Sequence, residues 1–327
     1  MDVSVIIPVY GVAGFVERCT ESLMRQSMRE GVEFIFVDDA TPDDSITLVR
    51  KVVERHPERA AQVRILTHEA NQGLPAARNT GLKAARGEFV IQFDGDDFAE
   101  PTMIEDLYAA VKNNNADFAW SDYYITFENK KRIIKQPDYK TPIEAVRGML
   151  RGSMKYNVWN KICRLSIYKD NSIEFPVGYA MGEDITMIML ALHSRKCAYV
   201  EKPLYNYVQN QGQMTATFNE EKLNSLRYNC NRIREYINNK FPNFGLESES
   251  AALNQLMKWP FLLDGKYSSY RRWHEWFPES NKYIWQTKGV NKRIKFIEWC
   301  AANHLYPIVW LHYIIVIKLY YGIVYGK

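Results

Sequence analysis

Through about residue 120 the spacing of apolar residues alternates between a strand-like and a helix-like pattern, and this alternation constrains the fold more than any other feature. Short runs of β-branched and aromatic residues are typical of buried strands, whereas apolar residues three and four positions apart are typical of helices. The runs that predict strands are Val3–Ile7, Glu33–Val37, Val63–Leu66, Phe89–Phe93 and Phe118–Trp120. Helical spacing lies between them, at Phe15–Leu23, Ile46–Val53, Pro75–Ala85 and Ile104–Val111. Strands that alternate with helices predict an α/β fold, in which helices flank a mostly parallel sheet on both faces.

Local signals set the expected ends of these elements. Pro8 is expected to end the first strand, and Asp44 or Ser45 to cap the second helix. The basic stretch Lys130–Lys135 predicts a solvated turn. Farther along the chain, apolar spacing predicts further helices over Ile143–Met149, Met181–Leu192 and 220–240.

The composition is that of a globular protein without a nucleic-acid partner. Of the 327 residues 46% are hydrophobic, enough for a principal domain and a smaller C-terminal part. The net charge of +4 is too small to indicate nucleic-acid binding. The five cysteines are scattered without a C-x-x-C pair, which argues against a zinc site or disulfide framework and favours a reducing compartment. No basic segment followed by an apolar run opens the chain, so we expect no secretory signal and a cytoplasmic location.

Polar side chains gather where the predicted strands end. Tyr10 follows the first strand, Asp38 and Asp39 end the second, and Asp94-Gly95-Asp96-Asp97 follows the fourth. In parallel sheets these ends share one edge, where ligands bind. Three carboxylates in four residues repel one another unless a cation lies among them, and Mg²⁺ or Mn²⁺ commonly bridges carboxylates to phosphates. A surface turn is the alternative, but the buried strand before the cluster favours a metal–diphosphate site.

The pair Asp38 and Asp39 has two interpretations. One of these carboxylates could serve only to cap the following helix, or it could accept the ring N–H of a pyrimidine base. Tyr10 could supply an aromatic face to the base or ribose. The sequence lacks both G-x-G-x-x-G and G-x-x-x-x-G-K-[ST]. Phosphate must therefore be bound by a metal, basic groups or a helix N-terminus.

Several motifs occur in a characteristic order along the chain. They are Ile6–Tyr10, Val37–Thr41, Asn71–Gly81, Ala85–Glu88 and Asp94–Asp97. Together they resemble glycosyltransferase family 2, closely over the first 125 residues or so and more loosely to about residue 215. The resemblance implies the Rossmann-like GT-A fold. Residues 1–125 would form its nucleotide-sugar-binding half and residues 126–218 its acceptor-side half, before a helical C-terminal region over 219–327.

The resemblance also implies donor-side roles. In the D-x-D motif, Asp96 would bind the metal directly and Asp94 would lie near the ribose or sugar. Asp39 would face the uracil ring. The other implied residues are Pro8 and Tyr10, which would line the nucleotide pocket, Asp97, which would shape the site or contact the donor, and Arg78, which would lie beside the nucleotide or form an ion pair that fixes its loop.

On the acceptor side, Gly182-Glu183-Asp184 resembles the family's later acidic motif. Asp184 would be the catalytic base and Glu183 a site-shaping neighbour, although acidic residues are also favoured at a helix N-terminus. Trp159-Asn160-Lys161 resembles a segment between the two sites, with Trp159 in the core and Asn160 and Lys161 shaping the site. Relatives often carry a basic residue and a Ser-x-Thr where this chain has Val208-Gln209 and Gln213-Met214-Thr215, which weakens the case for a phosphate contact there.

The implied activity is inverting, metal-dependent transfer of a sugar from a nucleotide sugar, with Mn²⁺ or Mg²⁺ as cofactor. Asp39 and Tyr10 suit a UDP-sugar, and a hydroxyl of a glycan or lipid-linked acceptor would receive the sugar in cell-surface polysaccharide synthesis. A sugar-nucleotide pyrophosphorylase is an alternative, but Tyr10–Gly14 lacks the arginine its loop would need. A catalytically inactive binding or assembly subunit is another, and the intact Asp96 and Asp184 oppose it.

The C-terminal run Trp299–Ile317 contains no Lys, Arg, Asp or Glu and is flanked by basic residues. It approaches the length of a membrane span, but Asn303, His304, Pro307 and His312 make a span costly. We therefore expect an interfacial segment on the cytoplasmic face of a membrane. The alternative is a helix packed on the catalytic domain.

Overall fold

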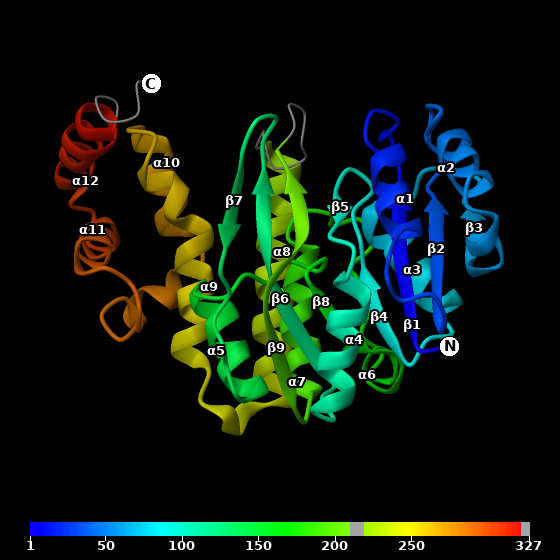
Figure 1. The fold of residues 1–327 in the computed structure, drawn as a ribbon. Helices are drawn as coiled ribbons and strands as arrows, with labels where there is room; N and C mark the ends of the chain where they lie inside the picture. The colour runs from blue at the N-terminus through cyan, green and yellow to red at the C-terminus, as the bar shows by residue number, and fades with distance from the viewer. Residues whose placement is uncertain (210–218, 322–327) are drawn as a thin grey trace. The chain divides into compact units, whose positions relative to one another are not determined.

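The computed structural model describes residues 1–209 and 219–321, and it divides into two compact units. Unit 1 comprises Met1–Val146 and Lys155–Ile233, and unit 2 comprises Arg147–Met154 and the chain from Arg234 onward. Figure 1 shows that strands belong to unit 1 and that unit 2 is helical where it is described. The α/β fold with a smaller helical C-terminal part is confirmed.

Unit 1 is built on one nine-stranded sheet with the order β3-β2-β1-β4-β8-β6-β9-β5, and β7 pairs with β6 (Figure 1). The strands are β1 Val3–Val9, β2 Val32–Asp38, β3 Val63–Thr67, β4 Phe89–Gln92, β5 Phe98–Ala99, β6 Phe118–Thr126, β7 Lys131–Ile134, β8 Lys161–Arg164 and β9 Cys197–Val208. The first four strands are parallel, with Ile6 paired to Ile35 on one side and to Gln92 on the other. Their ends therefore open on one edge.

The helices of unit 1 follow the alternation of the sequence. They are α1 Val16–Met24, α2 Ser45–Glu54, α3 Leu74–Ala84, α4 Met103–Asn113, α6 Leu165–Asp170 and α7 Thr186–His193, with the 3₁₀ turns η1 Pro57–Gln62 and η2 Glu183–Ile185. Two further helices, α5 Pro142–Arg151 and α8 Glu220–Lys240, begin in unit 1 and end in unit 2. Helices α1 and α2 pack together, and α3 packs on β1 and β2. Because the strand order reverses between β1 and β4, right-handed crossovers place α3 on the opposite face from α1 and α2.

Four local expectations need correction. Pro8 lies within β1, paired with Val37, because β4 ends its pairing at Ile6 and the missing N–H of proline costs no ladder bond there. The carboxylate of Asp43, rather than the side chain of Asp44 or Ser45, accepts the N–H at the start of α2. The predicted helix over 181–192 is shorter, since a 3₁₀ turn precedes α7.

The basic stretch near residue 130 forms an edge strand rather than a solvated turn. In β7, Arg132 pairs antiparallel with Ile125 of β6. Its side chains are mostly exposed, and charged residues on an edge strand discourage pairing with another chain. Basic composition alone therefore did not distinguish an edge strand from a turn.

Unit 2 consists of short helices around its own core. These are α9 Glu247–Lys258, α10 Tyr267–Glu275, α11 Lys292–Ala302 and α12 Tyr306–His312, the 3₁₀ turns η4 Pro242–Phe244, η5 Trp259–Leu262 and η6 Pro278–Tyr283, and the π-helical segment η7 Tyr313–Tyr321. The core is formed by Leu262, Tyr270, Trp273, Ile284, Ile297, Cys300, Ala301 and Val309. The apolar C-terminal run is split at His304, whose φ is +58°. Within residues 1–209 and 219–321, each helix is too short or too polar to cross a membrane.

Candidate active site

The acidic turn after β4, Asp94–Asp97, is held in place by hydrogen bonds from β9. Tyr205 donates its hydroxyl to Asp97 Oδ2 at 2.7 Å, and the N–H of Val208 donates to Asp97 Oδ1 at 2.7 Å. The Asp97 side chain is fully buried, and burial, followed by the charges of Asp96 and Asp94, raises its pKa well above the ordinary value. Both oxygens of the enclosed Asp97 carboxyl are therefore engaged in hydrogen bonds to β9.

Glycine within this turn has a steric reason. A Cβ at Gly95 would lie 3.1 Å from the carbonyl oxygen of Pro8 and 3.3 Å from Val12 Cγ2. The turn therefore packs closely against the end of β1. This contact brings the D-x-D motif beside the loop that follows Pro8, so the ends of β1 and β4 form one surface.

Asp96 and Asp94 form the partly exposed part of the turn. Burial and then the neighbouring Asp94 raise the pKa of Asp96 to about 6, which marks a carboxylate short of positive charge. Among the described residues, three or more His, Cys, Asp or Glu side chains do not gather as a metal-binding group. This arrangement fits Mg²⁺ or Mn²⁺, which commonly take one or two protein carboxylates and complete their shell with water and phosphate oxygens.

Arg78 on α3 joins two acidic segments that lie far apart in the sequence. Its side chain is 1% exposed; Nη2 lies 2.9 Å from Asp94 Oδ1 and 3.7 Å from Glu183 Oε1. Although burial lowers the pKa of Arg78, the charges of Asp94, Glu183 and Asp184 raise it above the ordinary value. A single guanidinium therefore holds the D-x-D turn and the Gly182–Asp184 segment together. Of its two expected roles, the structure places Arg78 in an ion pair.

Glu183 and Asp184 share a hydrogen bond between their carboxyl groups. Burial and the charge of Asp184 raise the pKa of Glu183 well above its ordinary value. Burial also raises the pKa of Asp184, but Arg78 and the hydrogen bond from Glu183 oppose that rise. Asp184 is the half-buried member of the pair, whereas Glu183 is buried.

Three residues whose structural roles were not predicted from the sequence hold the D-x-D turn and the stretch from Phe175 to Met181 in place. Asn79 exchanges two 2.8 Å hydrogen bonds with the backbone of Phe175, and Asn229 of α8 donates to the carbonyls of Tyr179 and Met181. The third is Tyr205, beneath the D-x-D turn. Buried asparagines that replace backbone partners leave no periodic signal in a sequence. Asn79 did lie inside the quoted Asn71–Gly81 motif.

Gly182 is also required by its surroundings. Its φ is +82°, and a Cβ there would lie 2.9 Å from Leu226 Cδ1 of α8. The left-handed backbone turns the chain into η2, which carries Glu183 and Asp184. A side chain at this position would be strained and would push the acidic pair away from α8.

Asp38 and Asp39 have different surroundings. The carboxylate of Asp39 is buried and accepts the N–H groups of Gln72 and Gly73, each at 2.8 Å, and lies 2.7 Å from His68 Nδ1. Asp38 is half-buried; its Oδ1 accepts the Thr41 N–H at 2.9 Å, and Oδ2 has no partner among residues 1–209 and 219–321. Asp39 therefore fixes the 71–73 loop, and Asp38 keeps an oxygen available.

The loop after β1 is tied to the loop after β2. The N–H groups of Gly11, Val12 and Ala13 donate to the side chains of Thr41, Ser45 and Asp43. Although burial raises it, hydrogen bonds from Ser45, Ala13 and Thr41 hold the pKa of Asp43 at about 2. At the end of β1, Pro8 is buried in the sheet, and the Tyr10 ring is 51% exposed beside this fixed loop. Tyr10 thus offers an open aromatic face.

The segment between the two acidic regions is buried. The Trp159 ring stacks on Tyr205 with 4.3 Å between centroids, so its expected place in the core is confirmed. Asn160 donates to the carbonyl of Ser121 and accepts from Lys161 Nζ. Burial lowers the pKa of Lys161 to about 7. Gln213-Met214-Thr215 lies outside the described residues.

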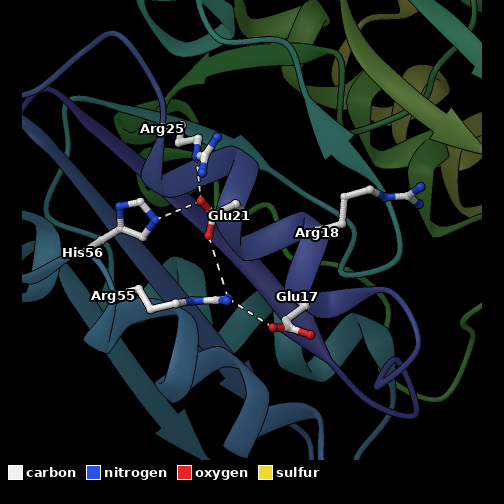
Figure 2. A pocket seen from close by; sticks show the side chains of 6 residues that line it. All are labelled: Glu17, Arg18, Glu21, Arg25, Arg55 and His56. Carbon is white, nitrogen blue, oxygen red and sulfur yellow. Dashed lines mark hydrogen bonds and ion pairs between the residues drawn. The ribbon is translucent and has the colours of Figure 1, made fainter.

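A hollow of about 430 Å³ lies away from these residues, between α1 and the end of α2 (Figure 2). Figure 2 shows Arg25, His56 and Arg55 around the Glu21 carboxylate and Arg55 reaching Glu17, whereas Arg18 is drawn without a dashed line. Three arginines and two glutamates line the hollow, so its lining carries net positive charge. The acidic residues of the D-x-D turn and of the Gly182–Asp184 segment do not line it, so the hollow is distinct from the candidate site.

Comparison with known proteins gives a consistent picture. Residues 4–179 match the family model described as glycosyl transferase family 2. The uncharacterized glycosyltransferase EpsJ of Bacillus subtilis is 29% identical over 224 residues, which cover 65% of this chain and 62% of EpsJ. The chain thus spans less than two thirds of that relative's length.

Two solved structures share the fold. One is S. aureus TarS 1–349 in complex with UDP-GlcNAc, with a TM-score of 0.72 at 20% identity over 96% of this chain and 91% of that one. The other is the mannosyltransferase PcManGT from Pyrobaculum calidifontis in complex with GDP-Man and Mn²⁺, with a TM-score of 0.53 at 16% identity over 96% of this chain and 87% of that one. The TM-scores support the GT-A fold. At sequence identities this low, they do not assign a donor or an acceptor to this chain.

Proposed function

The chain belongs to glycosyltransferase family 2, and from that premise we propose that it transfers a sugar from a UDP-sugar to an acceptor hydroxyl, with inversion and a divalent metal. The observation that carries the proposal is Arg78, which joins Asp94 of the D-x-D turn to Glu183 beside Asp184. A donor-diphosphate site and a candidate base thus share one guanidinium. That arrangement suits a displacement in which the leaving group and the attacking hydroxyl must be held at once.

Asp96 is the proposed metal ligand, because its carboxylate is short of positive charge and partly exposed. When bound there, Mg²⁺ or Mn²⁺ would neutralise charge on the departing diphosphate. Asp94, fixed by Arg78, would orient the ribose or sugar. The buried Asp97 keeps the turn in shape through Tyr205.

Asp184 is the proposed base. It would take the proton from the acceptor hydroxyl as that oxygen attacks the anomeric carbon. Asp184 is the more exposed member of the pair, and Arg78 and Glu183 oppose the rise of its pKa, which supports Asp184 as the member that accepts the proton. A single displacement without an enzyme nucleophile inverts the anomeric centre, and an α-linked donor would give a β-linked product.

For the nucleobase of the donor, we propose that Asp38 and Asp39 have different roles. Asp39 holds the 71–73 loop, and the available oxygen of Asp38 would accept the uracil ring N–H beside the Tyr10 ring. This moves the expected base contact from Asp39 to its neighbour. Residues 1–125 would then serve the donor and residues 126–218 the acceptor, with Asn160 and Lys161 shaping the boundary between them.

We propose a glycan or lipid-linked acceptor in polysaccharide synthesis, in a reducing compartment. Within residues 1–209 and 219–321, which include all five cysteines, no disulfide forms, and this supports that compartment. An inactive subunit that only binds or assembles is the second candidate. Release of UDP distinguishes the two, because a binding subunit would retain the nucleotide sugar intact.

The test is a panel of nucleotide sugars incubated with purified protein and Mn²⁺ or Mg²⁺, with release of the nucleoside diphosphate measured. We expect metal-dependent release from a UDP-sugar, and Asp96→Ala should abolish it without changing thermal unfolding. Asp170→Ala, an exposed acid at the end of α6, is the control and should retain full activity. Release that persists in Asp96→Ala with Mn²⁺ present would refute the metal assignment.

A further inference from the structure

Unit 2 exposes large hydrophobic side chains to an unusual degree. Of the nineteen such side chains exposed among the described residues, nine lie between Trp285 and Leu319. They are Trp285, Phe296, Trp299, Leu305, Ile308, Trp310, Leu311, Ile315 and Leu319, and we call them the apolar face. Single exposed hydrophobic residues are normal, whereas a concentrated set marks an interaction surface.

The apolar face is not the inward side of its helices. On the inward side, Val309 is fully buried, the His312 ring lies 6.3 Å from Trp259, and Tyr306 packs on Tyr270. On the outward side, Leu311, Ile315 and Leu319 recur every four residues, each 51% exposed. A helix that is apolar all round is normally covered on every side. The outward stripe therefore lacks its cover.

The charges around the apolar face have one sign. From Ser280 to Lys327 the sequence holds seven Lys or Arg residues and a single acid, Glu298. The Glu298 side chain is 2% exposed, whereas Lys292, Arg293 and Lys318 are exposed. Lys292 and Arg293 begin α11, one turn before Phe296, and Lys318 precedes Leu319. Within residues 280–321 the exposed charge is thus cationic, although two exposed acids from earlier in unit 2, Asp264 and Glu275, also lie near α12 and η7.

We propose that the apolar face of unit 2 docks on an anionic lipid surface. Tryptophan and tyrosine rings suit the boundary between headgroups and acyl chains, and lysine and arginine side chains suit phosphate headgroups. The helices that carry the face are α11, of 11 residues, and α12, of 7 residues, followed by the π-helical segment of 9 residues. Short helices with an exposed apolar stripe lie in an interface instead of crossing it.

The charge pattern selects this occupant over a second copy of the chain. Two copies that met through the apolar face would bring two sets of cations together, with no exposed acid of residues 280–321 to pair with them. An anionic bilayer supplies the missing negative charge and covers the apolar stripe. The inference goes beyond the proposed sugar transfer, since lipid binding requires neither donor nor acceptor.

The test is co-sedimentation of the full chain with two kinds of vesicle, one of phosphatidylglycerol mixed with phosphatidylcholine and one of phosphatidylcholine alone. We expect binding to the anionic vesicles that weakens with salt, and little binding to the neutral ones. Ile315→Glu should weaken binding about tenfold or more, since it removes a buried apolar contact and adds a charge. The double variant Lys292→Glu, Arg293→Glu should weaken it by about tenfold or more.

Ile133→Glu is the matched control, because Ile133 is also 51% exposed but lies on β7 of unit 1. It should bind vesicles like the unchanged chain. UDP release without vesicles should be the same in Ile315→Glu as in the unchanged chain, so failure of the lipid proposal and failure of the proposed transfer remain distinct. Equal binding to both vesicles, no binding to either, or a dimer that Ile315→Glu dissociates would each overturn the proposal.

Discussion

Buried carboxylates of unit 1 such as Asp39 and Asp117 have donors directed at them. In unit 2 the buried Glu249 is paired with Arg151, whereas the buried Glu298 has no hydrogen-bond donor among the described residues. Asp39 accepts two backbone N–H groups, and Asp117 is held by Arg164 and Arg195. Although burial raises it, hydrogen bonds from Arg195 and Arg164 lower the pKa of Asp117 to about 2. Burial raises the pKa of Glu298 to about 7, and the charge of Lys258 only partly opposes that rise.

A buried carboxylate with hydrogen-bond or ion-pair partners is held in one position. Unit 1 contains such pairing where its two acidic segments meet at Arg78. Unpaired burial fixes nothing and leaves a group that titrates near neutrality. Unit 2 contains such an unpaired buried carboxylate, Glu298, together with the exposed apolar face. These two properties are expected of an interaction surface rather than of a catalytic site.

The largest effect is expected for Asp184→Asn, which tests the proposed base in unit 1. If paired burial in unit 1 positions a base, turnover should fall by about 10²–10⁴-fold, because amides do not accept a proton under these conditions. UDP binding with metal, measured by calorimetry, should not change. Glu183→Gln is the matched variant and should lose far less, because Glu183 is the buried member of the pair and is not the proposed base. Loss of UDP binding in Asp184→Asn would move that residue to the donor site.

Arg78→Met tests whether the guanidinium is needed between the acids. Removing a buried cation leaves its partners unpaired, and we expect the free energy of unfolding to fall by about 3–5 kcal/mol. Arg78→Lys should lose less, since it keeps the charge. Without the cation the pKa of Asp184 rises, so the acidic limb of the pH–kcat profile should move to higher pH. An unchanged profile in folded Arg78→Met protein would leave Arg78 with a structural role alone.

Asp39→Asn and Asp38→Asn sharpen the comparison within a single pair. Asn at position 39 places an amide N–H against two backbone donors, and we expect a loss of about 1–3 kcal/mol in the free energy of unfolding. Asn at position 38 should leave stability nearly unchanged and weaken UDP binding. Chemical unfolding and calorimetry on both variants give the answer. If Asp39→Asn were stable but unable to bind UDP, the base contact would belong to Asp39.

In unit 2 the expected effect of Glu298→Gln is a gain in stability rather than a loss. The pKa of Glu298 in the folded chain, about 7, lies above the ordinary value of 4.5, so its contribution to stability is full below about pH 4.5 and is lost as the pH rises through 7. Gln stays neutral, so the variant should match the unchanged chain near pH 4.5 and be more stable above pH 7, by about 3 kcal/mol. Lys258, whose burial lowers its pKa to about 7, is the same in both chains.

Tryptophan fluorescence follows this experiment well, because six of the eight tryptophans lie in unit 2. Asp117→Asn in unit 1 is the contrasting variant. It should be less stable at neutral pH, since its paired carboxylate contributes stability above the ordinary pKa that is lost only as the pH falls toward 2. A Glu298→Gln chain no more stable above pH 7 would mean that Glu298 has a partner in solution.

The sequence predicted the parallel half of unit 1 well because its signals are local. Apolar runs such as Val3–Ile7 and helix signals such as Pro75 arise from neighbours within one element. The antiparallel strand β8 was missed because its pairing depends on distant partners, such as Ala119 for Ile162, whereas β7 pairs with the adjacent β6 and was missed because its basic residues were interpreted as a turn. Periodicity cannot report a partner more than forty residues away.

The site followed the same rule. Motif order brought Asp94, Asp96 and Asp184 to attention, and the structure brings their segments together at Arg78. It could not separate Asp38 from Asp39, since adjacent identical residues differ only in what surrounds them after folding. Asn229, more than forty residues beyond Asp184, carried no recognisable pattern at all.

The hydrogen bonds from Asn229 have a consequence for shortening the protein. The family model matches only as far as residue 179, before Asp184 and well before α8. A truncated protein cut at that boundary would keep the nucleotide half of the sheet but lose Glu183 and Asp184 together with the helix that clamps the carbonyls of Tyr179 and Met181. Such a fragment would be a nucleotide-binding module without a base. Any minimal version intended to turn over substrate has to extend at least through the first half of α8.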